Sequence, residues 1–284
     1  PSVTRCHILL DSLQHICLMH GMEVAYYKKL FQTIGNIIEL IEKDDIPKYL
    51  LFLENAFPYM DNYNYHKGMN GIIQELTGLL RTKNIGTDSD RALLLDFQAT
   101  LETKPEKAIK LEKDALAQIE TITADNARLV SNLHANLGGL YRMNAHPDLA
   151  REHMEKSISL LDQFNLLHIN DSIPQIANYA MFLTEQQEPE RGISELQKLS
   201  GIIKEYHSDD CLDYAKVQET LGTIYLMTAN LPQAKTHFKR AFKIYEKIWA
   251  DEPEMIEAKY QEIQELYPQI GFCIGKNLSG LLTK

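Results

Sequence analysis

One group of side chains near the N-terminus could bind a metal ion. Cysteine and histidine occur together there, as Cys6, His7, His15, Cys17 and His20. Thiolate and imidazole are the usual ligands of Zn²⁺. The ten-residue gap between Cys6 and Cys17 matches no common zinc spacing, and both fall in an apolar helical pattern where a buried thiol is an ordinary core residue. We therefore expect no metal site and no cofactor.

Paired carboxylates and phosphate-binding loops are the next features that could carry chemistry. Asp44-Asp45 and Asp209-Asp210 stand at expected helix starts, where a short acidic side chain caps free backbone amides. No GxxxxGK followed by Ser or Thr, and no GxGxxG, precedes a helix, and GxSxG and HExxH are absent. We expect that the chain is not an enzyme and that any nucleotide would be bound only by a domain outside it.

Composition and charge exclude other classes of function. The 284 residues carry a formal charge of −10 without a basic stripe, so direct binding to nucleic acid is not expected. The cations Lys235, Lys239, Arg240 and Lys243 are expected to form a solvated helix face. No apolar run reaches the 18 residues of a membrane span, and no secretion signal is present. The four cysteines, scattered without paired spacing, indicate a reducing compartment, so we expect a cytoplasmic protein.

A pattern of large and small side chains recurs every 42 residues. The helices that it predicts must position any functional site. The clearest copy is LGTIYLMTANLPQAKTHFKRAF, with Leu221, Gly222, Tyr225, Ala234 and Phe238. Earlier copies begin at Leu53, Leu95, Leu137 and Tyr179. The first two are looser, because Asn70 and Glu112 stand where an apolar residue is expected. We expect the small residues Gly138, Ala150, Gly222 and Ala234 to lie where two helices approach closely, beside large Tyr141, Tyr225 and Phe238.

Prolines keep the same pitch. Pro105, Pro147 and Pro189 are each 42 residues apart, and Pro232 comes one residue late. Because proline is tolerated in the first turn of a helix, these residues mark the start of each second helix. The expected helical hairpins span about 46–81, 89–121, 125–164, 172–206 and 211–250. Acidic residues at or near their starts are expected to cap them, namely Asp45, Asp88, Asp125, Asp171 and Asp209.

The pattern of Leu-Gly, an aromatic residue, and then Ala, an aromatic residue and Ala resembles the tetratricopeptide repeat, whose usual length is about 34 residues. The longer pitch is similar to the long-helix variant of kinesin light chains and bacterial peptide-sensing regulators. The resemblance implies an all-α, right-handed superhelical solenoid. We expect a capping helix pair over 1–44, five repeats over 45–250 (about 47–88, 89–130, 131–172, 173–214 and 215–250), and a C-terminal capping helix and tail over 251–284, with the helix after Pro253 running to about Lys276.

The N-terminal segment carries a second resemblance. PSVTRCHILLDSLQHICLMHG and YYKKLFQTIGNIIELIEKDD, expected as helices over 3–19 and 23–43, followed by 42-residue repeats, resemble the region after the winged helix of bacterial NB-ARC-type (STAND) signal-transduction NTPases. The chain begins at Pro1 without an initiator Met, as an excised piece would. The resemblance implies the sensor or protein-interaction arm of such an NTPase.

The repeat also predicts where a partner binds. Side chains of each first helix that face away from the second helix line a concave groove, where a peptide or protein segment would lie. The candidate binding residues are Asn132, Asn136, Arg142, Asn178, Met181, Glu185, Glu219 and Thr223. Asn136 and Asn178 share one register, and stacked amides could hold a peptide backbone or bond neighbouring helices. Arg142 could bind a carboxylate bidentately. Two alternatives remain open, a stand-alone adaptor and the peptide-sensing domain of a quorum-sensing transcription regulator.

Overall fold

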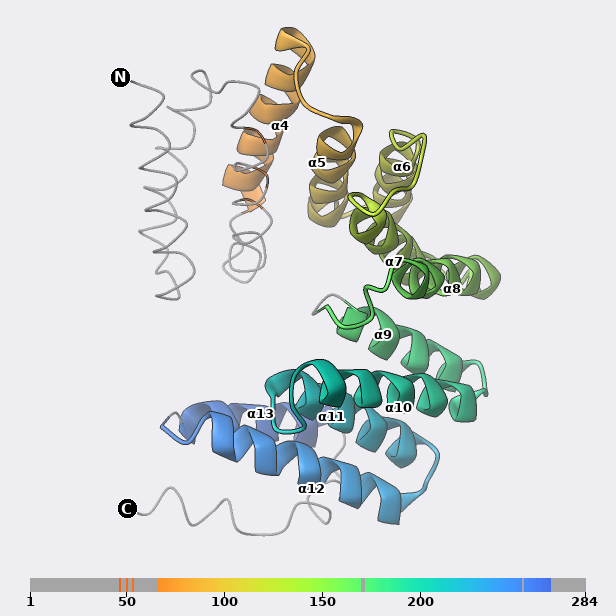
Figure 1. Ribbon diagram of the computed structural model, residues 1–284, viewed down its shortest axis with the longest axis vertical. Coiled ribbons are helices and arrows are strands. Elements are labelled where there is room, and N and C mark those ends of the chain that lie inside the picture. The colour runs from red at the N-terminus through yellow and green to blue at the C-terminus, as the bar shows by residue number, and fades with distance from the viewer. Residues whose placement is uncertain are drawn as a thin grey trace. The chain divides into compact units, whose positions relative to one another are not determined.

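The computed structural model describes Ile46, Leu50, Leu53 and residues 66–169, 172–251 and 253–266 (Figure 1). All secondary structure in these ranges is α-helical. The helices expected over 3–19 and 23–43, the cysteine and histidine group near the N-terminus, and the end of the final helix lie outside the described residues. The chain divides into two compact units at Asn144, and each is described by itself.

The first unit contains four described helices. They are α4 (His66–Lys83), α5 (Asp88–Leu101), α6 (Pro105–Leu116) and α7 (Ala127–Met143). Each packs on the next along the chain, and α5 also touches α7. Ala92 of α5, Ala115 of α6 and Leu133 of α7 are fully buried together. This small core fixes the spacing between α5 and α7.

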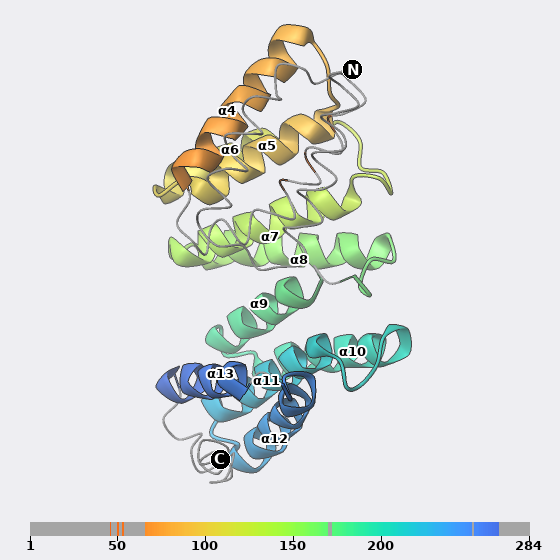
Figure 2. The ribbon, with the colours of Figure 1, turned by 90° about the vertical axis from the view of Figure 1, so that its left-hand side faces the viewer.

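The second unit contains six described helices. They are α8 (Pro147–Gln163), α9 (Ser172–Glu185), α10 (Pro189–Tyr206), α11 (Leu212–Met227), α12 (Leu231–Ile248) and α13 (Pro253–Leu266). Figures 1 and 2 show α9 to α12 as successive helices lying side by side. One apolar core runs from Leu161 to Ile263, with Phe238 and Phe242 at its centre. Since α13 contributes Ile263 and packs on α12, it continues the stack.

The prolines open helices as the sequence predicts. Pro105, Pro147 and Pro189 are the first residues of α6, α8 and α10, and Pro232 is the second residue of α12. This part of the hairpin prediction is confirmed. Pro232 comes one residue late in the 42-residue pitch because Leu231, and not the proline, is the first residue of α12.

The expected acidic caps are wrong in detail. Thr87 caps α5 in a reciprocal box with Asp90, whose carboxylate accepts from the Thr87 amide at 2.6 Å. Cys211 caps α11, its sulfur accepting from the Tyr214 amide at 3.4 Å. Asn126 precedes α7 without a side-chain cap. Asp88 and Asp125 stand next to these positions and Asp209 stands two residues before Cys211. None of them is the cap, because capping depends on the one residue that leaves helical geometry. Asp45 and Asp171 lie outside the described residues.

Three hairpin turns share a left-handed backbone conformation that the sequence pattern did not predict. Ala145, Gln187 and Ala229, each 42 residues apart, have φ of 56°, 66° and 59°. Each follows the end of a first helix, where a left-handed residue reverses the chain direction. None is glycine, so each turn carries the cost of a side chain in this region.

Close helix contacts depend on missing side chains at two glycines of the second unit. A Cβ on Gly222 would lie 2.9 Å from the ring of Phe238, which confirms the expected pairing of small and large residues. A Cβ on Gly192 would lie 2.7 Å from the Ala180 carbonyl oxygen. The second clash is harder to relieve, because backbone cannot rotate away.

Candidate functional site

A groove of about 390 Å³ lies on the first helices of the first unit, α5 and α7. We call it the α5–α7 groove. Its apolar lining is Leu50, Leu93, Phe97 and Leu129, and its polar lining is Ser89, Asp90, Asp96, Asp125, Asn126, Arg128 and Asn132. The lining therefore combines four apolar residues with seven polar ones, and ligand-binding sites pair apolar contact area with polar groups that fix orientation.

Helix geometry places these side chains on one surface. Leu93 and Phe97 are four residues apart on α5, and Leu129 and Asn132 are three apart on α7, so each pair lies on one helix face. Phe97 is buried while Leu93, Leu129 and Asn132 are half-buried. Asp125 and Arg128 are exposed at the start of α7. The site therefore combines contact area with accessible charge, and it includes Asn132 from the predicted set.

A cluster of three polar side chains, of which only Glu112 is buried, joins α5, α6 and α7 at the groove. Asn136 donates from Nδ2 to Asp96 Oδ1 at 2.8 Å, and Glu112 of α6 hydrogen-bonds both residues. Glu112 is 1 % exposed. Burial, followed by the charge of Asp96, raises the pKa of Glu112 from 4.5 to about 10. Glu112 is therefore protonated at neutral pH and donates a hydrogen bond to Asp96. Asn136 lies in a contact between helices, one of the two roles its register allowed.

The remaining predicted residues have different surroundings. Arg142 is half-buried on α7, while Asn178 and Glu185 are exposed on α9. Met181 packs against the core of the second unit, and Thr223 is half-buried on α11. Their use in binding stays a prediction, and the structure places only Asn132 in the α5–α7 groove.

Glu219 of α11 is held by two other helices. It accepts a hydrogen bond from the Tyr245 hydroxyl of α12 at 2.6 Å, and Lys259 of α13 lies 2.9 Å away. Burial and the negative charge of Glu219 raise the pKa of Tyr245. Since both ends of the Lys259–Glu219 pair are about one-fifth exposed, Glu219 anchors α13 to the helices before it.

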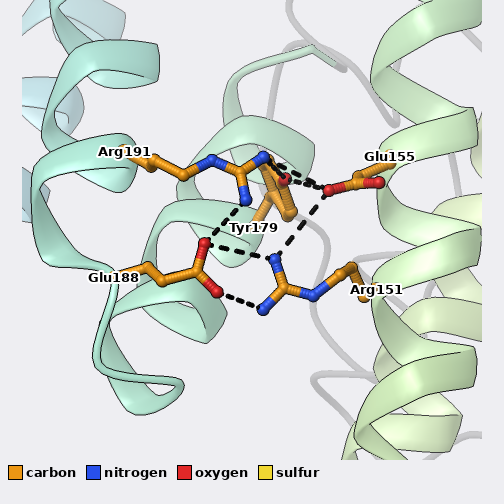
Figure 3. A network of polar contacts seen from close by, with 5 residues as sticks. All are labelled: Arg151, Glu155, Tyr179, Glu188 and Arg191. Atoms are coloured by element: carbon orange, nitrogen blue, oxygen red, sulfur yellow. Dashed lines mark hydrogen bonds and ion pairs between the residues drawn. The ribbon is translucent and has the colours of Figure 1, made fainter.

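A network of five side chains that was not predicted from the sequence joins α8, α9 and α10 (Figure 3). Arg151 donates to Glu188 at 2.6 Å, and Arg191 donates to the other oxygen of Glu188 at 2.6 Å. The Tyr179 hydroxyl donates to Glu155 at 2.8 Å, and Arg191 lies 3.3 Å from the same carboxylate. The hydrogen bonds from the two arginines hold the pKa of Glu188 below its usual range. Within the second unit, the network therefore ties α8 and α9 to α10 at the turn that precedes α10.

A hydrogen-bonded pair of serine and glutamine recurs between successive hairpins of the second unit. Ser157 of α8 donates to Gln175 of α9 at 2.5 Å, and Gln218 of α11 donates to Ser200 of α10 at 3.3 Å. In both cases the partners are 18 residues apart. This spacing, Ser followed 18 residues later by Gln, is a signal that a search for polar repeats in the sequence could have found.

Stacked helical hairpins with small residues at the contacts define a class, the helical repeat proteins. The tetratricopeptide repeat model matches residues 172–247, which contain α9 to α11 and all of α12 but its last residue. No curated protein matches the sequence.

Solved structures with the same fold support this assignment. BtubC, also called BKLC, from P. vanneervenii is 16 % identical with a TM-score of 0.50, covering 80 % of this chain and 84 % of that one. A Podosopora anserina protein described as a kinesin light chain with nearly identical TPR-like repeats is 15 % identical with a TM-score of 0.51, covering 66 % and 92 %. A single-residue variant of it gives 0.52. The expected all-α fold of tetratricopeptide-type hairpins is confirmed.

Two other properties concern only the residues that the structure describes. None of their helices combines the length and apolar character that a bilayer crossing requires. They contain no cluster of three metal-binding side chains. Cys211 is a free thiol, and it serves as the helix cap described above.

Proposed function

We propose that this chain is a non-catalytic repeat domain that binds an extended segment of a partner protein along its first helices. The observation that supports the proposal is the α5–α7 groove, which apolar and polar side chains from two successive first helices line together. Tetratricopeptide-type repeats are generally scaffolds for protein interaction, and helical repeats present extended surfaces that suit this role.

The charges along the α5–α7 groove favour a particular segment. Asp90, Asp96 and Asp125 supply three carboxylates, and Arg128 supplies one cation. A segment with Lys or Arg beside a leucine-sized side chain fits this surface, since charge complementarity sets the orientation while the apolar contact adds affinity. The net charge of −10 also attracts a basic segment, over distances longer than the groove itself.

Site-specific photocrosslinking tests the proposal. Peptides would first be selected from a displayed random library on the purified chain. A photoreactive residue would then replace Arg128, which is exposed in the groove, or Lys107, which is exposed on α6. We expect selected peptides to crosslink from position 128 and not from position 107. Crosslinking from position 107 alone, or selection of no peptide, would contradict the proposal.

The finer part of the proposal is that the repeats form the sensor arm of a bacterial signal-transduction NTPase in the cytoplasm. It rests on the resemblance of the N-terminal segment. The coding sequence upstream of Pro1 tests it. A phosphate-binding loop followed by a winged helix would support the sensor arm. A start codon close to Pro1 would favour the stand-alone adaptor, and a helix-turn-helix alone would favour the quorum-sensing regulator.

A further inference from the structure

A second groove, of about 550 Å³, lies in the second unit on helices that the proposed function does not use. We call it the α10–α12 groove. Its walls come from two second helices, α10 and α12, and from the start of α11. Its lining residues are Lys204, Asp209, Asp210, Tyr214, Lys239, Arg240, Lys243, Ile244 and Lys247. Five cations against two carboxylates make this surface positive on a chain whose net charge is −10.

The two carboxylates come from the connection between α10 and α11, and they pair with Lys204 and Lys247. Asp209 lies 3.3 Å from the ammonium of Lys204, and Asp210 pairs with Lys247. Lys204 also lies over the ring of Tyr214, 5.3 Å from its centre. Two adjacent acidic side chains on an irregular segment are thus already accommodated in the groove.

Two lysines of α12 differ from Lys204 and Lys247. Lys239 and Lys243 are exposed and line the groove, and within the described ranges neither has an ion-pair partner. Arg240 reaches Gln218 at 3.5 Å on the neighbouring helix. The groove therefore has two accessible ammonium groups that the described part of the chain does not neutralise.

The spacing of these lysines matches an extended chain. Lys239, Lys243 and Lys247 recur every four residues along α12, which is about 6 Å per step at the rise of an α-helix. In an extended strand, alternate side chains on one side are about 6.7 Å apart. A segment running along α12 can therefore place every second side chain against one lysine after another.

We propose that the α10–α12 groove binds an extended acidic segment of a partner protein, with carboxylates at alternate positions, and that Asp209 and Asp210 compete with it for Lys204 and Lys247. The two internal carboxylates select against a densely charged polymer such as nucleic acid, because they place negative charge beside its path. They select for a short segment that lies beside them or displaces them. The inference is independent of the α5–α7 groove, with which it shares no residue.

Fluorescence anisotropy with a labelled Asp-Ala-Asp-Ala-Asp-Ala-Asp peptide tests the site on the full chain. We expect Lys239→Glu and Lys243→Glu to weaken binding at least tenfold at physiological salt. The control is Lys156→Glu, an exposed position on α8 with the same change of charge, which we expect to change affinity less than twofold. Equal weakening by all three substitutions would show general attraction and overturn the proposal. Circular dichroism establishes that each variant is folded.

A second experiment tests whether Asp209 and Asp210 compete with the bound peptide. Combining Asp209→Asn with Asp210→Asn should strengthen peptide binding several-fold. The charge-matched control, Asp148→Asn with Glu152→Gln on α8, should leave it within twofold. Tighter binding of a single-stranded oligonucleotide than of the peptide, or no peptide binding by the Asp209→Asn, Asp210→Asn protein, would overturn the proposal. Crosslinking from position 128 should be unaffected by Lys239→Glu, so failure here leaves the proposed function standing.

Discussion

A hydrogen-bonded pair of carboxyl groups takes the place of a glycine and a phenylalanine in one repeat. Gly222 and Phe238 touch in the last hairpin, and the residues 126 positions earlier are Asp96 and Glu112. The second pair fills the same contact between helices with polar atoms. A buried carboxyl is tolerated there because it is neutral and donates to its partner. The sequence showed that Glu112 departs from the apolar repeat pattern. The proton shared by the two carboxyl groups could not be predicted, because it depends on burial that only the folded chain provides.

Replacing Glu112 with Gln should make the protein less sensitive to pH. The raised pKa means that the folded state holds a proton that the unfolded chain releases above pH 4.5. The stability from this group is complete below pH 4.5 and is lost as pH rises towards about 10, at a slope of up to about 1.4 kcal/mol per pH unit. Glutamine keeps a donor to Asp96 without a titrating proton.

Urea unfolding of both proteins between pH 5 and pH 8 measures this difference. We expect the advantage of the Glu112→Gln protein over the parent to grow steadily with pH. Glu75→Gln, at an exposed position on α4, serves as the control and should show no such trend. A constant difference across the range would mean that Glu112 does not carry a raised pKa.

Two glycines of α10 should respond to alanine with opposite signs. The Cβ of Gly192→Ala would meet the Ala180 carbonyl oxygen at 2.7 Å, and relieving this contact should cost about 1–3 kcal/mol. Gly201, on the same helix, has open space around it, so Gly201→Ala should gain about 0.5–1 kcal/mol from the lower entropy of the unfolded chain. Chemical denaturation of the two variants checks both values. A gain in both would contradict the close approach of α9 and α10.

At the scale of elements, features that depend on local sequence were predictable. The prolines located the starts of α6, α8 and α10, since the restriction on proline operates within one helical turn. The recurring small residues located close contacts, as Gly222 shows. The fold class follows from these two patterns together.

Features that depend on neighbouring helices were not predictable. Asn132 lies in the α5–α7 groove, whereas Asn136, one turn later on the same helix, bonds to Asp96 of α5. Both occupied the same expected face. Glu219 likewise was expected in a groove, and the contacts that the structure gives it are to Tyr245 and Lys259 of two other helices. The repeat register predicts which face of its helix a residue occupies. The residues that it contacts on that face come from other helices and cannot be read from the register.

The network joining α8, α9 and α10 should depend on one hydroxyl group. Tyr179 is 4 % exposed, and its hydroxyl donates to Glu155 while accepting from Arg191. Tyr179→Phe keeps the ring and removes these bonds, so we expect a loss of about 1–3 kcal/mol, the range for bonds to charged groups. Tyr206→Phe, at a half-exposed tyrosine that stacks on His168, should change stability by less than about 0.5 kcal/mol. Thermal unfolding of both variants compares them, and equal effects would show that the hydroxyl is not structural.

Across the whole molecule, two grooves of opposite charge lie on different classes of helix. The α5–α7 groove has three carboxylates, two on α5 and one just before α7, and the α10–α12 groove has five cations on second helices. Repeat architecture permits this separation, because each helix contributes one face to the core and another to the surface. Partners of opposite charge could therefore bind the two grooves without competing for the same residues.

Contacts between sequence neighbours also determine how the chain unfolds. The described helices pack mainly on the helices next to them, so stability in such an array is nearly a sum of local terms. Gly192→Ala should therefore reduce amide hydrogen-exchange protection in α9 and α10 and leave α5 and α6 at their original level. Gly201→Ala supplies the matched comparison, since it alters the same helix without the clash. If protection in α5 and α6 fell by the same factor as in α9 and α10, the two units would unfold as one, and the additive description would not apply to this protein.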